Sequence, residues 1–177
     1  MQITGGYLKS RKIKVLNAQN VKPTLSKTRQ AFYSTLDSLI DSEGAAFLDV
    51  FSGSGIMAFE AISRGFTSVH AIEKDRKTFQ YIKENAKFLD VKINLIFGVA
   101  EKVVLKLTNK FDVIFMDPPY DSDLYEVLLD LIVKQDLLMD NGVIIMEHPS
   151  AKSIDIRPFR LIKAKTYGDK NLSYLML

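Results

Sequence analysis

Cysteine is absent from the 177 residues of this chain, and only 9 glycines and 5 prolines are present. The absence of cysteine excludes disulfides, thiolate-bound metal centres and thiol nucleophiles, so any covalent catalysis would need another group. The scarcity of glycine and proline, together with 47% hydrophobic residues, excludes a fibrous repeat and argues against disorder. No apolar run approaches the roughly 18 residues that a membrane-spanning helix needs. These features predict one globular domain with a sizeable core.

Acidic residues are also missing from positions 1–30, which hold seven basic residues. The rest of the chain has 17 basic and 21 acidic residues, so a basic N-terminal edge is joined to a body of net charge −4. A secretory leader would need an apolar core of roughly 7–15 residues after its charges, and none follows. We therefore expect a cytoplasmic protein whose basic edge binds a polyanion, with a solvated basic strand pair as the alternative.

Short apolar runs rich in Val, Ile and Phe alternate with helical patterns beyond residue 45. The predicted strands are 46–51, 68–73, 93–97, 112–116 and 143–147. The predicted helices are 56–63, 76–88, 100–107 and 124–134. Asp75 and Asp123 are placed to cap the second and the fourth of these helices. The alternation predicts a doubly wound α/β sheet that binds its ligand beyond the carboxyl ends of the strands.

Both ends of the chain depart from this alternation. Residues 1–15 predict a small hairpin, and the apolar stripe in residues 25–40 predicts a helix. The C-terminal sequence predicts a closing antiparallel hairpin with strands at 159–166 and 172–177. The expected organisation is a single domain, 1–177, made of a basic N-terminal hairpin and helix, 1–41, and a Rossmann-like core, 45–177.

A glycine-rich loop follows the first predicted strand. Gly53 and Gly55 allow a tight turn from strand to helix, and an acid, Glu73, lies 20 residues after Gly53. This arrangement suits a ribose diol, and nicotinamide-dependent and S-adenosylmethionine-dependent Rossmann domains share it. Asp49 would repel a pyrophosphate but suits an ammonium and a sulfonium, which favours the methyl donor. The alternative is a tight turn that binds no ligand.

The fourth predicted strand leads into Asp117, Pro118, Pro119 and Tyr120. Two prolines remove two backbone donors and fix two φ angles, so the carbonyl groups here are held facing outward. The Asp117 carboxylate and the Pro118 carbonyl can accept the two hydrogens of an exocyclic amino group and direct its lone pair at a methyl group. Tyr120 supplies a flat face for an extruded base. The motif predicts in-line methyl transfer without a metal, the alternative being a loop that starts a helix.

Taken in order, these motifs resemble the RsmD family of class I S-adenosylmethionine-dependent methyltransferases. The resemblance covers nearly the whole chain and rests on residues 3–6 with Arg11 and Lys12, 22–24 with Arg29, 48–55, 73–75, 117–120 and 167–169. It implies a Rossmann-like sheet of seven strands, mostly parallel, and a bacterial cytoplasmic location. It also implies methylation of the exocyclic N2 amino group of a specific guanine in 16S ribosomal RNA, within a small-subunit assembly particle.

The resemblance assigns roles to individual residues. S-adenosyl-L-methionine is expected at Asp49, Gly53, Gly55, Glu73 and Ala100. The target base is expected at Asp117, Pro118 and Tyr120, and the RNA at Arg11, Lys12, Lys22, Thr24 and Arg29. The family commonly has an acid or amide after the third strand to meet the adenine amino group, whereas this chain has Val99. Adenine contacts are therefore expected from backbone groups near Ala100, with Glu101 as a weaker substitute.

Other functions remain open at this stage. Adenine-N6 methylation of a nucleic acid would use the same Asp117 motif, although no separate target-recognition region suggests a DNA-modification enzyme. A nicotinamide oxidoreductase would share the glycine loop, and a non-catalytic RNA-binding assembly factor would use residues 1–30 without transferring a methyl group. Protein glutamine methylation is disfavoured, because it usually has Asn where this chain has Asp117.

Overall fold

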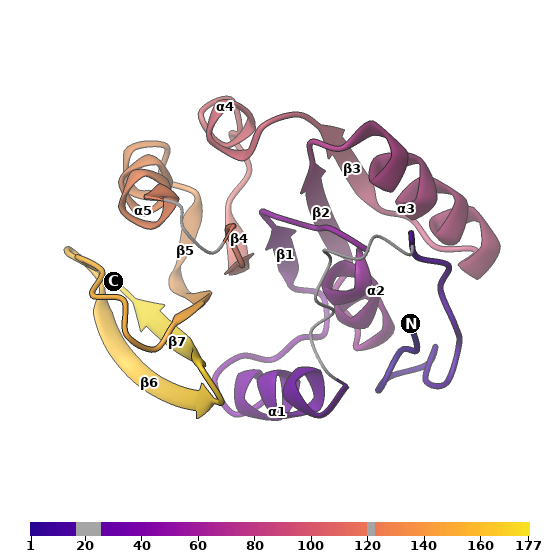
Figure 1. The fold of residues 1–177 in the computed structure, drawn as a ribbon, viewed down its shortest axis with the longest axis horizontal. Helices are drawn as coiled ribbons and strands as arrows, with labels where there is room; N and C mark the ends of the chain where they lie inside the picture. The colour runs from indigo at the N-terminus through magenta and orange to yellow at the C-terminus, as the bar shows by residue number, and fades with distance from the viewer. Residues whose placement is uncertain (17–25, 120–122) are drawn as a thin grey trace.

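A computed structural model describes residues 1–16, 26–119 and 123–177 of the chain. Within these ranges seven strands form one sheet, in the order β3-β2-β1-β4-β5-β7-β6 (Figure 1). In chain order they are β1 (Ala46–Asp49), β2 (Ser68–Glu73), β3 (Asn94–Phe97), β4 (Phe111–Met116), β5 (Leu138–Pro149), β6 (Arg160–Tyr167) and β7 (Lys170–Met176). Strands β1 to β5 are parallel, and β7 pairs antiparallel with β5 and β6. The predicted fold class, including the C-terminal antiparallel hairpin, is confirmed.

Helices cover both faces of the sheet. They are α1 (Ser26–Leu36), α2 (Ile56–Ser63), α3 (Arg76–Leu89), α4 (Ala100–Val104) and α5 (Leu124–Lys134). Because successive strand residues point to opposite faces, Phe47 packs in the core with α1, α2 and α3, while Leu48 packs in the core with α4 and α5. No helix in the described ranges is long and apolar enough to cross a lipid bilayer.

The strand order reverses between β1 and β4. From β1 the chain moves through β2 to β3 on one side, and β4 then pairs with β1 on the other side. Asp49, the last residue of β1, is in register with Phe115 of β4, so Asp117 follows just beyond the same edge. Ligands of doubly wound sheets bind at such a reversal, outside the carboxyl ends of the strands. The fold therefore places both predicted acidic motifs at one crevice.

The N-terminal segment forms the predicted hairpin in an irregular form. Its two halves run antiparallel. Met1 and Ile13 exchange backbone hydrogen bonds of 2.9 and 2.8 Å, and the Ile3 amide donates one of 2.9 Å to the Arg11 carbonyl. Among the described residues the pairing counts as one isolated bridge, between Gln2 and Lys12. Gly6 and Ser10 both have a φ of 72°, which turns the backbone out of a regular strand between these halves. The segment nevertheless packs firmly on the body, because Ile3 and other apolar residues are buried in the core beside α2.

Several element boundaries also differ from the sequence-based ones. Strand β5 begins at Leu138, well before the predicted 143, because Leu138 pairs with Phe111 ahead of an irregularity in the ladder. The predicted cap at Asp75 is confirmed, since its carboxylate accepts a hydrogen bond from the Thr78 amide at 2.7 Å. Asp123 is the N-cap residue of α5, as predicted, but its side chain makes no capping bond and lies 3.5 Å from the Lys152 ammonium.

Candidate active site

A cavity of about 380 Å³ lies at the carboxyl edge of the sheet. Its wall is built by the segments that follow successive strands: Gly53 after β1, Glu73 and Lys74 at the end of β2, Gly98, Val99, Ala100 and Glu101 after β3, and Asp117 and Pro119 after β4. Three acids and one base, Lys74, contribute to this wall. An acidic cavity of this kind favours a cationic ligand and disfavours a pyrophosphate.

The two glycines of the β1–α2 loop serve different purposes. Both have left-handed backbone conformations, with φ of 51° at Gly53 and 77° at Gly55, which favour glycine. A Cβ atom at Gly55 would lie 3.1 Å from side-chain carbons of Ile82 and Phe59, so this glycine also permits close helix packing. A Cβ atom at Gly53 would meet nothing within 4 Å, and Gly53 lines the cavity. Gly53 is thus the position where a ligand can approach the backbone.

Glu73 ties the loop to the start of α3. One carboxylate oxygen accepts a hydrogen bond from the Gly53 amide at 2.8 Å, and the other accepts one from the Asp75 amide at 2.7 Å. Partial burial raises the pKa of Glu73, and these backbone donors oppose the shift. The carboxylate is therefore fixed at the cavity wall with lone pairs left for a further donor.

Asp49 lies beneath the glycine loop and does not line the cavity. Its side chain is 1% exposed and accepts a 3.1 Å hydrogen bond from the Ser52 hydroxyl. Burial raises the pKa of Asp49 to about 7, and the neighbouring charges of Glu73 and Asp117 act in the same direction. Its Oδ1 has no hydrogen-bond partner among the described residues. Asp49, which was expected to suit the ammonium group of the ligand, therefore lies one layer below the cavity surface.

Asp117 contributes directly to the cavity wall. Burial raises its pKa to about 7, and the negative charge of Glu147 adds to the increase while Lys170 opposes it. The next residue, Pro118, is buried, and Pro119 is exposed and lines the cavity. Of the expected base-binding residues, Tyr120 lies outside the described residues. A carboxyl group with a pKa near 7 can both accept a hydrogen bond and take up a proton at neutral pH.

Comparison with known proteins identifies the family of the chain. The model of a family described as conserved hypothetical protein 95 matches residues 1–176. The chain belongs to this family. The ribosomal RNA small subunit methyltransferase D of Buchnera aphidicola subsp. Acyrthosiphon pisum is 33% identical over 86% of this chain and 80% of its own length. Its counterpart from Haemophilus influenzae is 30% identical over 95% of this chain and 89% of its own.

A solved structure agrees with these relatives. The proposed methyltransferase yhhF from Escherichia coli has a TM-score of 0.87 to this chain at 25% identity, covering 99% of this chain and 96% of that one. The resemblance to the RsmD family of methyltransferases is therefore confirmed.

Two residues that the sequence did not single out lie near Asp117 in this RsmD-family chain. Lys170 of β7 contacts the Glu147 carboxylate of β5, and its ammonium lies 3.9 Å from the Asp117 carboxylate. The antiparallel register of β5 and β7, which pairs Pro149 with Lys170, brings the lysine to the carboxyl end of β5. The only signal in the sequence was the turn at 167–169, which places position 170 at the start of a returning strand.

Glu101 is better placed than its sequence position suggested. It lines the cavity together with the buried Ala100 at the start of α4. The Oε2 atom of Glu101 is buried and has no hydrogen-bond partner in the described part of the chain. A buried acceptor without a donor is costly, so this oxygen is available to an amino group of a ligand.

The expected RNA-binding residues are not all at the surface. Arg11 and Lys12 are exposed, whereas Lys22 and Thr24 lie outside the described residues. Arg29 is 3% exposed; it contacts the Glu60 carboxylate at 3.3 Å and donates a 2.8 Å hydrogen bond to the Gln2 carbonyl. The structure thus corrects the expectation for Arg29, because a buried guanidinium held by Glu60 joins the N-terminal segment to the body and has little surface for a phosphate.

Proposed function

We propose that the chain transfers a methyl group from S-adenosyl-L-methionine to the exocyclic N2 amino group of a guanine in 16S ribosomal RNA. The observation that carries this proposal is the position of Asp117 and its proline neighbour on the wall of an acidic cavity beside Gly53 and Glu73. The small-subunit ribosomal RNA named for the relatives supports this substrate class. We place the reaction in the cytoplasm, on a small-subunit assembly particle.

The cavity fits this cofactor better than a nicotinamide dinucleotide. Glu73 is held by two backbone amides in a position to accept hydrogen bonds from ribose hydroxyls. The acidic wall suits an ammonium and a sulfonium and would repel a pyrophosphate. When bound, S-adenosyl-L-methionine supplies an electrophilic methyl group.

Asp117 acts on the acceptor nitrogen. Its carboxylate accepts one hydrogen of the guanine amino group, and the Pro118 carbonyl accepts the other, so the nitrogen lone pair is directed at the methyl carbon. As the N–C bond forms, the S–C bond would break and the sulfur would leave as a neutral thioether. The nitrogen keeps both of its hydrogens and becomes positively charged, so one proton must be lost. A carboxylate whose pKa is about 7 is suited to receive that proton. Orientation supplies most of the acceleration.

The test is methyl transfer to small ribosomal subunits that lack native methylation. Labelled S-adenosyl-L-methionine is used, and the product nucleosides are separated and identified. We expect N2-methylguanosine. Detection of N6-methyladenosine instead would show that the methyl group goes to the adenine amino group, and the proposed guanine acceptor would be wrong. Absence of transfer to subunits and to naked 16S ribosomal RNA, in a protein that binds the cofactor, would contradict the proposal.

Replacing Glu101 by alanine should weaken binding of S-adenosyl-L-homocysteine by about tenfold. The variant removes the buried Oε2 acceptor, and one hydrogen bond to an amino group contributes roughly 1 to 1.5 kcal/mol. Glu101→Gln keeps a carbonyl acceptor and should lose less. Isothermal titration calorimetry gives the affinities, and an unchanged affinity in the alanine variant would remove Glu101 from the site.

The pH dependence of methyl transfer should follow the ionisation of Asp117. The rate should rise with pH, with its midpoint at about 7, and then level off, because only the carboxylate can accept a hydrogen bond from the amino group. Lys170 lowers the pKa of Asp117, so Lys170→Met should move the midpoint to higher pH. Glu147 raises that pKa, so Glu147→Gln should move the midpoint to lower pH. Single-turnover rates at saturating RNA and cofactor measure both shifts, and unchanged midpoints would exclude Asp117 as the titrating group.

A further inference from the structure

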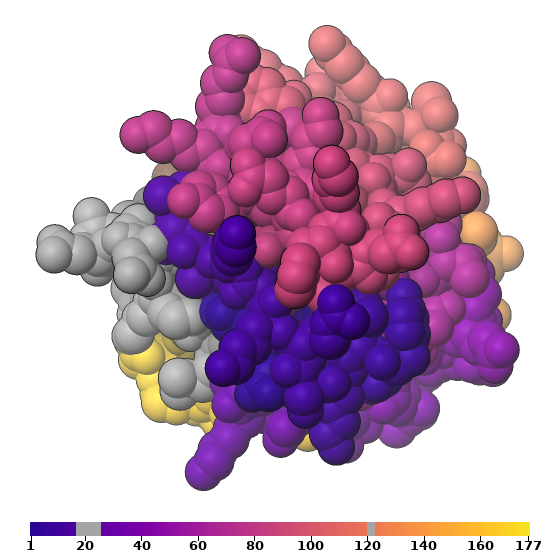
Figure 2. Space-filling model, turned by 90° about the vertical axis from the view of Figure 1, so that its right-hand side faces the viewer, coloured from indigo at the N-terminus to yellow at the C-terminus, as the bar shows by residue number. Residues whose placement is uncertain are grey.

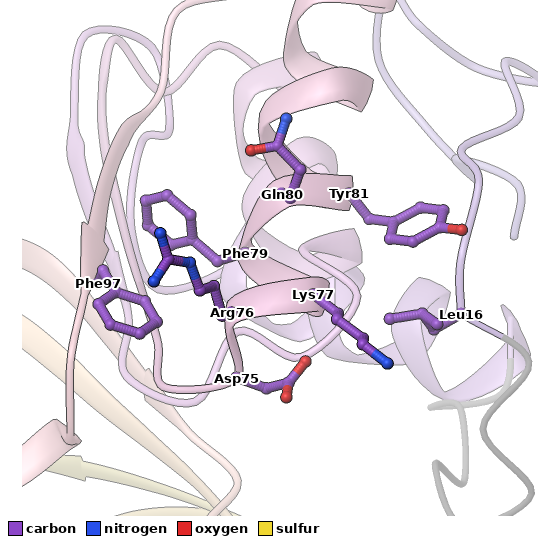
Figure 3. Close-up of a pocket in the computed structure, with 8 residues that line it drawn as sticks. All are labelled: Leu16, Asp75, Arg76, Lys77, Phe79, Gln80, Tyr81 and Phe97. Carbon is purple, nitrogen blue, oxygen red and sulfur yellow. The ribbon is translucent and has the colours of Figure 1, made fainter.

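An open hollow of about 1110 Å³ lies at the β3 edge of the sheet, next to the candidate active site but separate from it. Figure 3 shows the rings of Phe79 and Phe97 on one side of the first turn of α3, and Lys77 and Leu16 on the other. Two chain segments connect the hollow to the cavity. Lys74 and Gly98 line the cavity, and their neighbours Asp75 and Phe97 line the hollow.

The hollow combines an exposed aromatic ring with available positive charge. Phe97 is 53% exposed, and its ring packs edge-on against Phe79 with 5.4 Å between centroids. Arg76 and Lys77 are exposed, and neither lies within 4.0 Å of a carboxylate among the described residues, although the charge of Lys77 acts on Asp75. The one acid in the wall, Asp75, is occupied in capping α3 through Thr78. The net character of the surface is therefore cationic and aromatic.

The basic N-terminal segment extends this surface. Lys14 exchanges two backbone hydrogen bonds with the Asn85 side chain of α3, at 2.9 and 2.7 Å, and Arg11 lies over the Phe88 ring at 5.4 Å. Figure 2 shows the N-terminal segment, in indigo, directly beside the magenta surface. The segment reaches the hollow at Leu16. One face of the molecule thus carries exposed cations from Arg11 to Arg76 and Lys77.

We propose that this hollow binds single-stranded RNA flanking the target nucleotide, with a base stacked on Phe97 and phosphates at Arg76 and Lys77. Positive charge favours a polyanion, and an exposed ring accepts any base, which is the combination that single-stranded nucleic acids recognise. An acidic peptide would use the charges but would have no need of the ring. This inference rests on the proposed function for the identity of the RNA, and its position beside the cavity suits a strand that continues from a base held at Asp117.

The test measures affinity for a 16S ribosomal RNA transcript and for a short fluorescent oligouridylate across a range of salt concentrations. Phe97→Ala and Phe97→Leu should each weaken binding about tenfold, whereas Phe97→Tyr should bind like the parent. Leucine preserves the packing on Phe79, so its loss of affinity cannot come from misfolding at that contact. Arg76→Gln with Lys77→Gln should reduce the salt slope of single-strand binding by about 1.4, which is the effect of two lost phosphate contacts.

The matched control removes one arginine and one lysine from the opposite edge of the sheet. Arg160→Gln with Lys163→Gln on β6 changes the net charge equally at exposed positions and should leave the salt slope nearly unchanged. Equal effects of the two charge pairs, or parent-like binding by Phe97→Leu, would overturn the inference. RNA binding is measured without methyl transfer, so a failure of this inference can be distinguished from a failure of the proposed methyltransferase activity. Affinity for S-adenosyl-L-homocysteine should be the same in all variants.

Discussion

Replacing Asp117 by alanine is expected to lower the single-turnover rate of methyl transfer by roughly 10²- to 10³-fold, with little change in cofactor affinity. The variant removes the acceptor that orients the amino group and receives its proton, and loss of one such preorganised group has effects of this size. Cofactor affinity should survive, because Gly53 and Glu73 retain their hydrogen bond. Lys170 also keeps Glu147 as its partner, so no buried charge is left alone.

Two further variants make this result specific. Asp117→Asn preserves the shape of the side chain and one acceptor but cannot take up a proton, so its rate should lie between those of the alanine variant and the parent. Asp123→Ala removes an exposed carboxylate near the same loop that does not line the cavity, and its rate should equal that of the parent. Rates are compared at saturating RNA, and affinities by calorimetry. An alanine variant as fast as the parent would remove Asp117 from the mechanism.

The central sheet and its helices could be predicted because their signals are local. Strand β2 and helices α2 and α5 have the predicted bounds, since continuous apolar runs and short flanking turns define them without reference to distant residues. The start of β5 could not be predicted in this way. Met139 is exposed and polar residues follow it, so nothing in the sequence around Leu138 indicates a strand. The strand begins there because Leu138 pairs with Phe111 of β4.

The candidate site was predictable where the fold itself determines position. Gly53, Glu73, Ala100 and Asp117 all lie at or beyond the carboxyl ends of parallel strands, so they meet at one edge and line one cavity. Residues that act through distant partners were not predictable. Lys170 reaches Asp117 only through the antiparallel register of the last strands.

Arg29 is a second residue whose surroundings could not be predicted, because its partner is distant in the sequence. In the sequence it is one of seven cations in a basic segment, and a phosphate contact was the natural expectation. Its partner, Glu60, lies 31 positions away on α2, which is otherwise almost entirely apolar. An acidic residue in the middle of an apolar helix indicates a buried partner, because a buried carboxylate needs a cation or several hydrogen-bond donors. This was the signal in the sequence that could have identified the partner of Arg29.

Replacing Glu60 by alanine is expected to reduce the free energy of unfolding by about 3 to 5 kcal/mol, the usual cost of removing one partner of a buried ion pair. Glu60 is fully buried and accepts hydrogen bonds from the Thr4 amide at 2.7 Å and the Thr4 hydroxyl at 2.8 Å. Its carboxylate also lies 3.3 Å from Arg29 and 3.5 Å from Arg64. The variant would leave the Arg29 guanidinium buried without its carboxylate and would remove the hydrogen bonds from Thr4 to α2. Urea unfolding followed by circular dichroism measures the loss.

A double variant and an exposed pair separate the charge effect from simple loss of contacts. Arg29→Met with Glu60→Leu removes both charges and fills the space with apolar groups, so it should be more stable than Glu60→Ala alone. Lys110→Ala breaks an ion pair of 2.6 Å with Asp136, but that pair is exposed and its loss should cost no more than about 1 kcal/mol. If Glu60→Ala were no more destabilising than Lys110→Ala, the buried carboxylate would not be a main contact between the N-terminal segment and the body. If the double variant were the less stable one, the hydrogen bonds to Thr4 would outweigh the buried charge.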